Sequence, residues 1–79
     1  MRVVRLNKIE GGRSLAFVDF ETDEGIIIKG FRLVNGSNGM FLAPPDEKGK
    51  DGKYYETVIL PKELKAKFEL LALEEFQKL

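Results

Sequence analysis

The spacing of the apolar residues changes once along the 79-residue chain, at Pro61. Before Pro61, short apolar runs separated by Gly, Asn and Asp are typical of β-strands joined by turns. After it, apolar residues recur at intervals of three and four, which is the spacing of one helix face. The pattern therefore predicts an α+β fold: a small antiparallel β-meander of about five strands followed by one C-terminal helix.

Turn signals set the bounds of the expected elements. The run Asn35–Gly39 contains two Asn-Gly pairs, and Pro44-Pro45 stops the short strand that follows it. The polar, glycine-containing stretch 46–53 is expected to be a loop. Pro61 suits the first turn of the helix, where a missing N–H costs no hydrogen bond. We expect a single domain over 1–79, with strands over about residues 2–9, 15–21, 26–33, 40–43 and 54–60 and a helix over about 61–78.

The expected elements carry more apolar surface than one helix can cover. Strands two and three have apolar residues on both faces, with Phe17 opposite Phe20, and Ile28 opposite both Ile27 and Phe31. A single helix covers only one face of a small sheet, so a second copy of the chain is expected to cover the rest. The homodimer interface is expected to involve five apolar residues: Phe20, Ile27, Phe31, Leu70 and Leu73.

Missing residue types exclude several functions. The chain has no Cys and no His, which rules out disulfides, thiolate zinc sites, cysteine nucleophiles and a Ser-His-Asp triad. We therefore expect no enzyme activity, no metal, no cofactor and no small-molecule substrate.

No apolar run approaches the roughly twenty residues of a membrane helix, and the start has no signal-peptide stretch. We expect a cytoplasmic protein with no membrane contact.

Charged residues offer few other sites. Thirteen Lys and Arg balance thirteen Asp and Glu, so a general attraction to nucleic acid is not expected. The acidic cluster of Asp19, Glu21, Asp23 and Glu24 matches no calcium loop and is interpreted as solvated. The N-terminal segment is the most basic part of the chain, but strand alternation places Arg2 and Lys8 on one face and Arg5 on the other.

The candidate binding site is the lysine-bearing loop before the fifth strand. Lys48, Lys50 and Lys53 precede Tyr54 and Tyr55, and basic side chains beside exposed aromatics commonly hold phosphates and stack on bases. Arg32 is a possible helper. The acids of the same loop, Asp46, Glu47 and Asp51, oppose this interpretation because they cancel the three lysines. A protein-interaction module that binds no nucleic acid is the alternative.

The segment from Phe31 to Pro44, followed by Asp51-Gly52-Lys53-Tyr54, resembles the stage V sporulation protein G family of small bacterial septation regulators. The resemblance spans essentially the whole chain and implies a β-meander with a C-terminal helix, a homodimer and a cytoplasmic regulator that binds nucleic acid, DNA more than RNA. The family has a basic pair shortly after the Pro of its loop. This chain has Asp46-Glu47 there, and its lysines come later, so either the longer loop brings Lys48 and Lys50 into that position or the ligand has changed.

Overall fold

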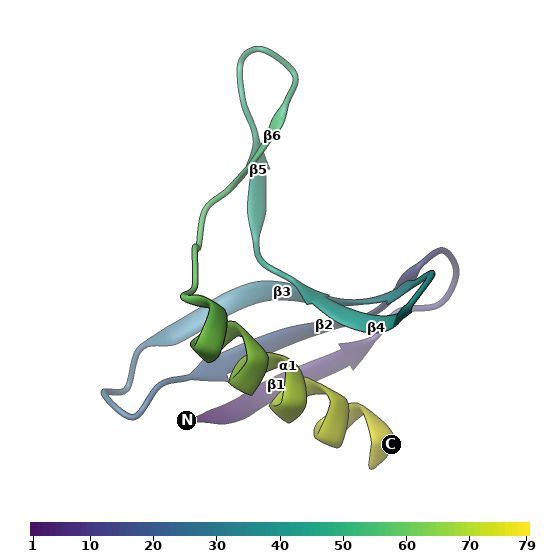
Figure 1. Ribbon diagram of the computed structural model, residues 1–79, viewed down its shortest axis with the longest axis vertical. Coiled ribbons are helices and arrows are strands. Elements are labelled where there is room, and N and C mark those ends of the chain that lie inside the picture. The colour runs from purple at the N-terminus through teal and green to yellow at the C-terminus, as the bar shows by residue number, and fades with distance from the viewer.

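The computed structural model describes residues 1–79 and contains a four-stranded antiparallel sheet, a separate two-stranded hairpin and one helix (Figure 1). The sheet has the meander order β1-β2-β3-β4, and α1 packs across one of its faces. The predicted α+β class is therefore confirmed, with four rather than five strands in the meander. The elements are β1 Arg2–Lys8, β2 Ser14–Glu21, β3 Ile27–Gly36, β4 Gly39–Ala43, β5 Asp46–Lys48, β6 Tyr54–Glu56 and α1 Lys62–Gln77.

The core lies between the helix and the inner face of the sheet. Three aromatic rings form its centre: Phe68 of α1 lies 4.5 Å from Phe20 and 5.5 Å from Phe31, measured between ring centroids. Phe20 and Phe31 meet edge to face, an arrangement that aromatic pairs favour. The fully buried residues are Ala16, Val18, Phe20, Phe31, Leu33, Leu42, Phe68 and Ala72. Phe20 and Phe31 thus belong to the core of one chain, and the expectation that they lie at a dimer interface is corrected.

A bulge in β3 changes which of its residues face the core. Phe20 pairs with Ile28 and Val18 with Phe31, so a two-residue step on β2 matches a three-residue step on β3. Gly30 lies in the bulge at a φ of +93°, which a residue without Cβ adopts readily, and its N–H donates to the Asp19 carboxylate at 3.1 Å. Ile28 and Phe31 consequently both pack on the core, and the expectation of opposite faces is wrong.

A second bulge, in β1, corrects the expected arrangement of the basic residues. Arg2 pairs with Glu21 and Arg5 with Asp19, and the register shifts between Val3 and Arg5. The extra residue turns Arg2 and Arg5 toward the same outer face of the sheet, away from the helix. Lys8 faces the other way, and its Nζ lies 5.6 Å from the centroid of the Phe76 ring.

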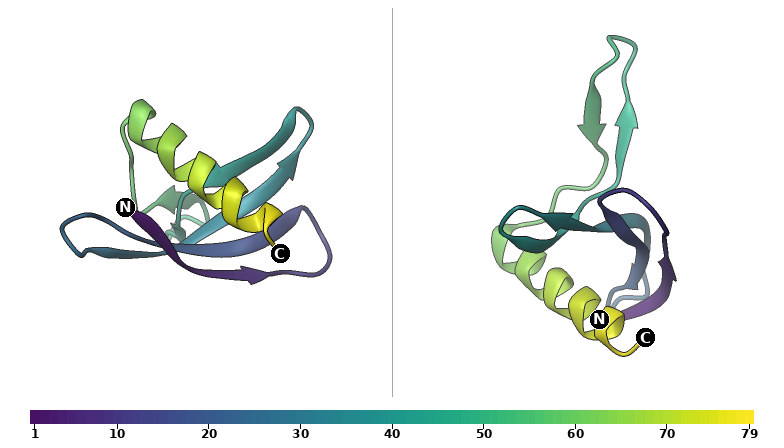
Figure 2. Two further views of the ribbon diagram at one scale, coloured as in Figure 1. Left: turned by 90° about the horizontal axis from the view of Figure 1, so that it is seen from below. Right: turned by 90° about the vertical axis from the view of Figure 1, so that its right-hand side faces the viewer.

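Residues 46–56 form a protruding hairpin, which we call the arm (Figure 2). The expected loop 46–53 therefore begins with strand β5, and the expected strand 54–60 ends at Glu56, where the pairing with β5 ends. The two sides of the arm close at its base, because the Thr57 N–H and hydroxyl both donate to the Pro45 carbonyl. The arm contributes no residue to the core.

The helix follows the arm after a short connecting segment. Pro61 immediately precedes α1 with a ψ of 149°, and its carbonyl accepts the N–H of Lys65 at 2.9 Å. Pro61 therefore occupies the N-cap position, and the helix begins at Lys62, one residue later than expected. No helix in the structure is both long enough and apolar enough to cross a membrane.

Candidate nucleic-acid interface

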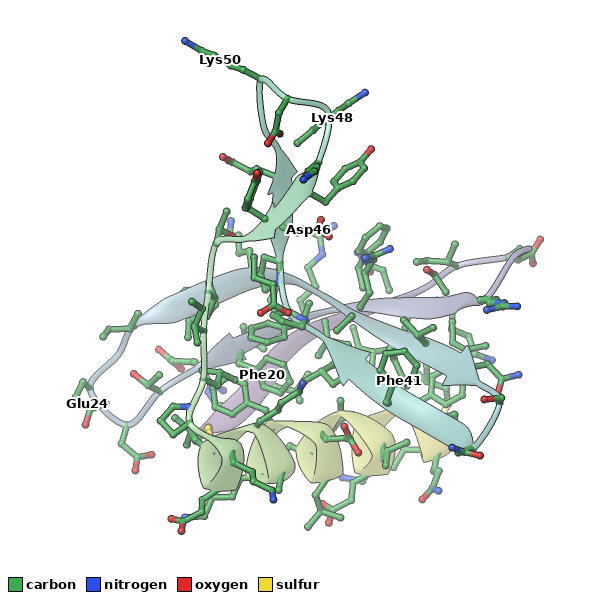
Figure 3. The ribbon with its side chains drawn as sticks, turned by 45° about the horizontal axis from the view of Figure 1, so that its top comes forward. Phe20, Glu24, Phe41, Asp46, Lys48 and Lys50 are labelled. Carbon is green, nitrogen blue, oxygen red and sulfur yellow. The ribbon has the colours of Figure 1, made fainter.

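The lysines of the arm and the acid at its base lie at different heights (Figure 3). Lys48 and Lys50 extend from the outer part of the arm, whereas Asp46 lies at its base beside the sheet. Lys48, Lys50 and Lys53 are all exposed, and none of them forms an ion pair. The lysines and acids of this segment cancel when they are counted in the sequence, but in the structure the lysines extend from the outer part of the arm and give it a basic tip.

Two of the four acids of the arm, Asp46 and Asp51, are held by neighbouring groups. Asp46 forms an ion pair with Arg32, with 3.7 Å between oxygen and nitrogen. Asp51 accepts hydrogen bonds from the Tyr55 hydroxyl and from the Lys53 N–H, and these bonds lower the pKa of its carboxyl below the ordinary value. The same contact raises the pKa of the Tyr55 hydroxyl. Glu47 has no such partner and remains the one solvated acid near the lysines.

The two tyrosines of the arm differ in what they contact. Lys48 pairs across the hairpin with Tyr54, which is 67% exposed, so an exposed ring stands beside an unpaired ammonium. Tyr55 points to the other face of the hairpin. Its ring covers Gly49 so closely that a Cβ there would lie 2.8 Å from it, and its hydroxyl is bonded to Asp51. Tyr55 therefore stabilises the turn of the arm, and Tyr54 is the aromatic residue available to a ligand.

Arg32 lies below the arm rather than at its tip. It belongs to β3, between Phe17 of β2 and Ala43 of β4, and its side chain is 38% exposed. Its contact with Asp46 connects the base of the arm to the outer face of the sheet. The structure therefore does not group Arg32 with the three lysines.

The remaining residues expected at a dimer interface do not form one surface. Ile27 is exposed in β3, whereas Leu70 is exposed on the helix, on the side away from the sheet. Leu73 is half-buried and packs against the core. Ile27 and Leu70 therefore lie on opposite sides of the molecule.

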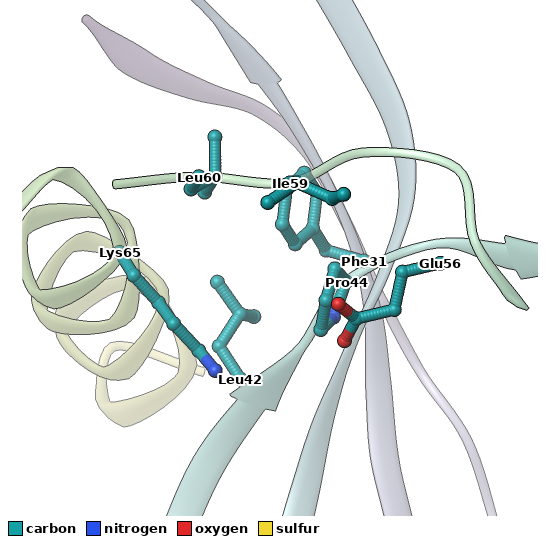
Figure 4. A pocket seen from close by; sticks show the side chains of 7 residues that line it. All are labelled: Phe31, Leu42, Pro44, Glu56, Ile59, Leu60 and Lys65. Atoms are coloured by element: carbon teal, nitrogen blue, oxygen red, sulfur yellow. The ribbon is translucent and has the colours of Figure 1, made fainter. Parts of the chain in front are cut away.

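One small pocket lies where the segment after the arm passes over the core (Figure 4). Ile59 and Leu60 cover one side, Leu42 and Lys65 the other, and Glu56 stands at the rim. Its volume of about 50 Å³ holds only a few water molecules and is far below that of a typical small-molecule site.

Sequence reasoning missed a second group of basic residues. Arg5, Lys29 and Arg32 surround Phe17 on the outer face of the sheet, and five of the six residues lining the shallow hollow there are polar or glycine. No spacing in the sequence brings these residues together, because the bulges in β1 and β3 set their directions. Strand alternation, which places Phe17 opposite Phe20, is the one sequence signal that concerns this group, and it did not show that the Phe17 face is the exposed one.

The sequence of the chain is similar to known proteins over most of its length. The sequence model of the SpoVG family matches residues 1–78, which is nearly the whole chain. The chain belongs to the SpoVG family. It is 30% identical over 77 residues to a Listeria monocytogenes protein that carries the name septation protein SpoVG 2, an alignment that covers 95% of this chain and 76% of that protein. A Staphylococcus aureus protein named septation protein SpoVG is 38% identical over 52 residues, covering 65% of this chain and 52% of that protein.

Membership of the SpoVG family confirms the resemblance found in the sequence. The segment from Phe31 to Pro44 that carried it forms the second half of β3, the tight turn and β4, and Asp51-Gly52-Lys53-Tyr54 forms the turn of the arm. The most recognisable motifs of this SpoVG-family chain thus lie on one continuous path from the sheet into the arm.

Proposed function

We propose that this SpoVG-family chain is a septation regulator that binds nucleic acid, DNA more than RNA, in the cytoplasm. Phosphates are held by Lys48, Lys50 and Lys53. The observation that carries the proposal is the set of three exposed, unpaired lysines on a protruding hairpin whose acids Asp46 and Asp51 are held by other groups. Such a tip enters the field of a nucleic-acid backbone before the rest of the neutral molecule does.

The chemistry of the tip predicts the type of binding. Lysines contact phosphate as point charges and do not read base edges, so binding is weak and poorly selective for sequence. Three phosphate contacts per chain correspond to a loss of roughly 40-fold in affinity between about 50 mM and about 200 mM salt. The single exposed ring of Tyr54 adds a stacking surface beside Lys48.

Fluorescence anisotropy with a short labelled duplex and a labelled single-stranded RNA tests this function. We expect binding at low salt that is lost at high salt, and a triple variant K48A/K50A/K53A that no longer binds the duplex. The matched control is K62A/K65A/K67A, which removes the same charge from exposed, unpaired lysines of the helix. Equal binding by the arm variant and the wild type would reject the arm as the site.

The proposal includes a homodimer. Only eight residues are fully buried, and large apolar side chains remain exposed on both sides of the molecule, among them Ile27 and Leu70. Two chains present two arms, and each doubling of phosphate contacts steepens the salt dependence. Light scattering coupled to size exclusion measures the mass. A single-chain mass at the concentrations used for binding would reject this part of the proposal.

A protein-interaction module is the second candidate, favoured by one observation. Ile59 is 82% exposed beside the pocket over the core, which is unusual for a large aliphatic residue. If folded protein binds no nucleic acid at low salt, this function replaces the first, and its apolar contacts would tolerate salt.

A further inference from the structure

The outer face of the sheet, on the side opposite the helix, presents two aromatic rings. Phe17 of β2 is 48% exposed and Phe41 of β4 is 44% exposed. The Phe41 ring lies close to Gly36, where an added Cβ would meet it at 2.8 Å, so the ring is held on one side while much of it remains exposed. Arg32 of β3 lies between the strands that carry the two rings.

Basic side chains surround Phe17, and the acidic side chains nearby form hydrogen bonds or ion pairs. Arg5 and Asn7 line the hollow beside the ring, and Arg5 has no ion-pair partner. Lys29 is exposed across the same hollow and has no ion-pair partner. Asp19 accepts the N–H of Gly30.

The two remaining acids of this face are held by arginines. Glu21 pairs with Arg2 at 2.8 Å, and Asp46 pairs with Arg32. The charges left without an ion pair are those of Arg5, Lys29 and Asp19, which line the hollow beside Phe17 and leave it with one net positive charge.

We propose that the outer face binds single-stranded nucleic acid, with bases stacked on Phe17 and Phe41 and phosphates held by Arg5 and Lys29. Open rings with unpaired cations beside them are complementary to unpaired bases joined by phosphates. Duplex bases are already stacked on one another and cannot reach these rings. The inference rests on the nucleic-acid-binding part of the proposed function, and adds a second surface and a strand preference to it.

The charges of this face favour a nucleic acid over a second copy of the chain. In a two-fold contact centred on Phe17, Arg5 and Lys29 of each copy would be brought close to the same cations of the other. Glu21 and Asp46 are already paired with Arg2 and Arg32, and Asp19 offsets only one of the two cations beside it. A polyanion supplies the missing negative charge.

A tryptophan reporter tests the stacking directly, because the chain contains no Trp. We expect the fluorescence of F17W to be quenched by oligothymidylate of roughly 15 nucleotides and not by a duplex of the same length. The matched control is L70W, which places Trp at a similarly exposed position on the helix and should show no quenching. Equal quenching in both variants, or none in F17W, would overturn the proposal.

Substitutions of Phe17 separate stacking from simple apolar contact. F17Y should keep the affinity for oligothymidylate, whereas F17L, which remains apolar but has no ring, should weaken it roughly 5- to 100-fold. Circular dichroism checks that each variant is folded. If F17L binds as tightly as the wild type, or if it changes the molecular mass instead of the affinity, the face is not a stacking surface.

The arm variant K48A/K50A/K53A distinguishes this proposal from the function above. If it loses duplex binding while F17W, carrying the same three substitutions, is still quenched by oligothymidylate, both surfaces act as proposed. If the arm variant still binds duplex but F17L loses the single strand, only the arm is rejected. If F17L binds the single strand normally while the arm variant loses both probes, only the outer face is rejected.

Discussion

Phe68 of the helix packs its ring against both core phenylalanines of the sheet, Phe20 and Phe31. We expect F68A to lower the free energy of unfolding by about 3–5 kcal/mol, because truncation removes buried area and leaves a cavity between helix and sheet. A domain of this size has only about 4–12 kcal/mol in total, so the variant should be close to unfolding at ambient temperature. Urea denaturation followed by circular dichroism measures the loss. F68L, which refills part of the space, should lose much less.

Substitution of Gly30 tests whether the bulge in β3 requires a residue that readily adopts a positive φ. An added Cβ would have only ordinary contacts with Pro45, at 3.7 Å, so space is available and the cost comes from the backbone. At a φ of +93° we expect G30A to cost about 1–2 kcal/mol of stability. Thermal or urea unfolding measures the change. A G30A variant as stable as the wild type would show that the bulge relaxes freely.

Residue faces were predictable from the sequence only where the strands are regular. Alternation correctly separated Phe17 from Phe20 in β2, but it did not show which of the two faces is the buried one. It failed in β1 and β3, because a bulge adds one residue and reverses the alternation beyond it. Gly30 is the only local sign of the bulge in β3, and nothing comparable marks the one in β1. The cluster around Phe17 was missed for this reason.

At the scale of elements, the arm was the part of the fold that the sequence did not reveal. Strand β5 consists of Asp46-Glu47-Lys48, which shows neither apolar alternation nor β-propensity. Its pairing depends instead on side chains of the opposite strand, since Tyr55 covers Gly49 and bonds Asp51. The helix and β1 to β4 carry recurring apolar residues, so the sequence predicts that these elements exist, and it predicts their bounds to within a few residues.

The contact between Asp51 and Tyr55 predicts how the arm responds to pH. The folded arm holds the pKa of Asp51 below its ordinary value of 3.8, so this stabilisation is complete above that pH and is lost as the pH falls through the lowered pKa. The pKa of Tyr55 is raised above 10.0, so its share is lost only as the pH rises through the raised value. We expect the amides of Gly52 and Lys53 to shift in NMR spectra below about pH 4 in the wild type.

The variant D51N isolates that effect. It removes the titrating group, so the low-pH shift of the Gly52 and Lys53 amides should disappear, while amides of the sheet titrate as before. Y55F removes the hydroxyl that donates to Asp51 and should move the midpoint of the shift toward the ordinary pKa of Asp. A midpoint unaltered by Y55F would mean that the Lys53 N–H alone is responsible.

At the scale of the whole molecule, the arm and the body, by which we mean the four-stranded sheet with the helix, depend on each other very little. All fully buried residues belong to the body, and the arm meets it near Pro45, Arg32 and Thr57 and through Glu56 at the rim of the pocket over the core. The body presents the outer face with Phe17, and the arm presents the lysines. The division makes the two proposed binding surfaces separable by deletion.

Replacing residues 46–56 by Asn-Gly is the test of this division. The Thr57 N–H already donates to the Pro45 carbonyl at 2.9 Å, so the two ends are in position for a tight turn, and Asn-Gly is the pair that two-residue hairpin turns prefer. Because no core residue is removed, we expect the free energy of unfolding to change by less than about 1 kcal/mol. Salt-sensitive duplex binding should be lost with the lysines, while the F17W signal with oligothymidylate should persist. A shortened chain that unfolds would show that the arm stabilises the body, and one that is folded yet still binds duplex would place the phosphate contacts outside the arm.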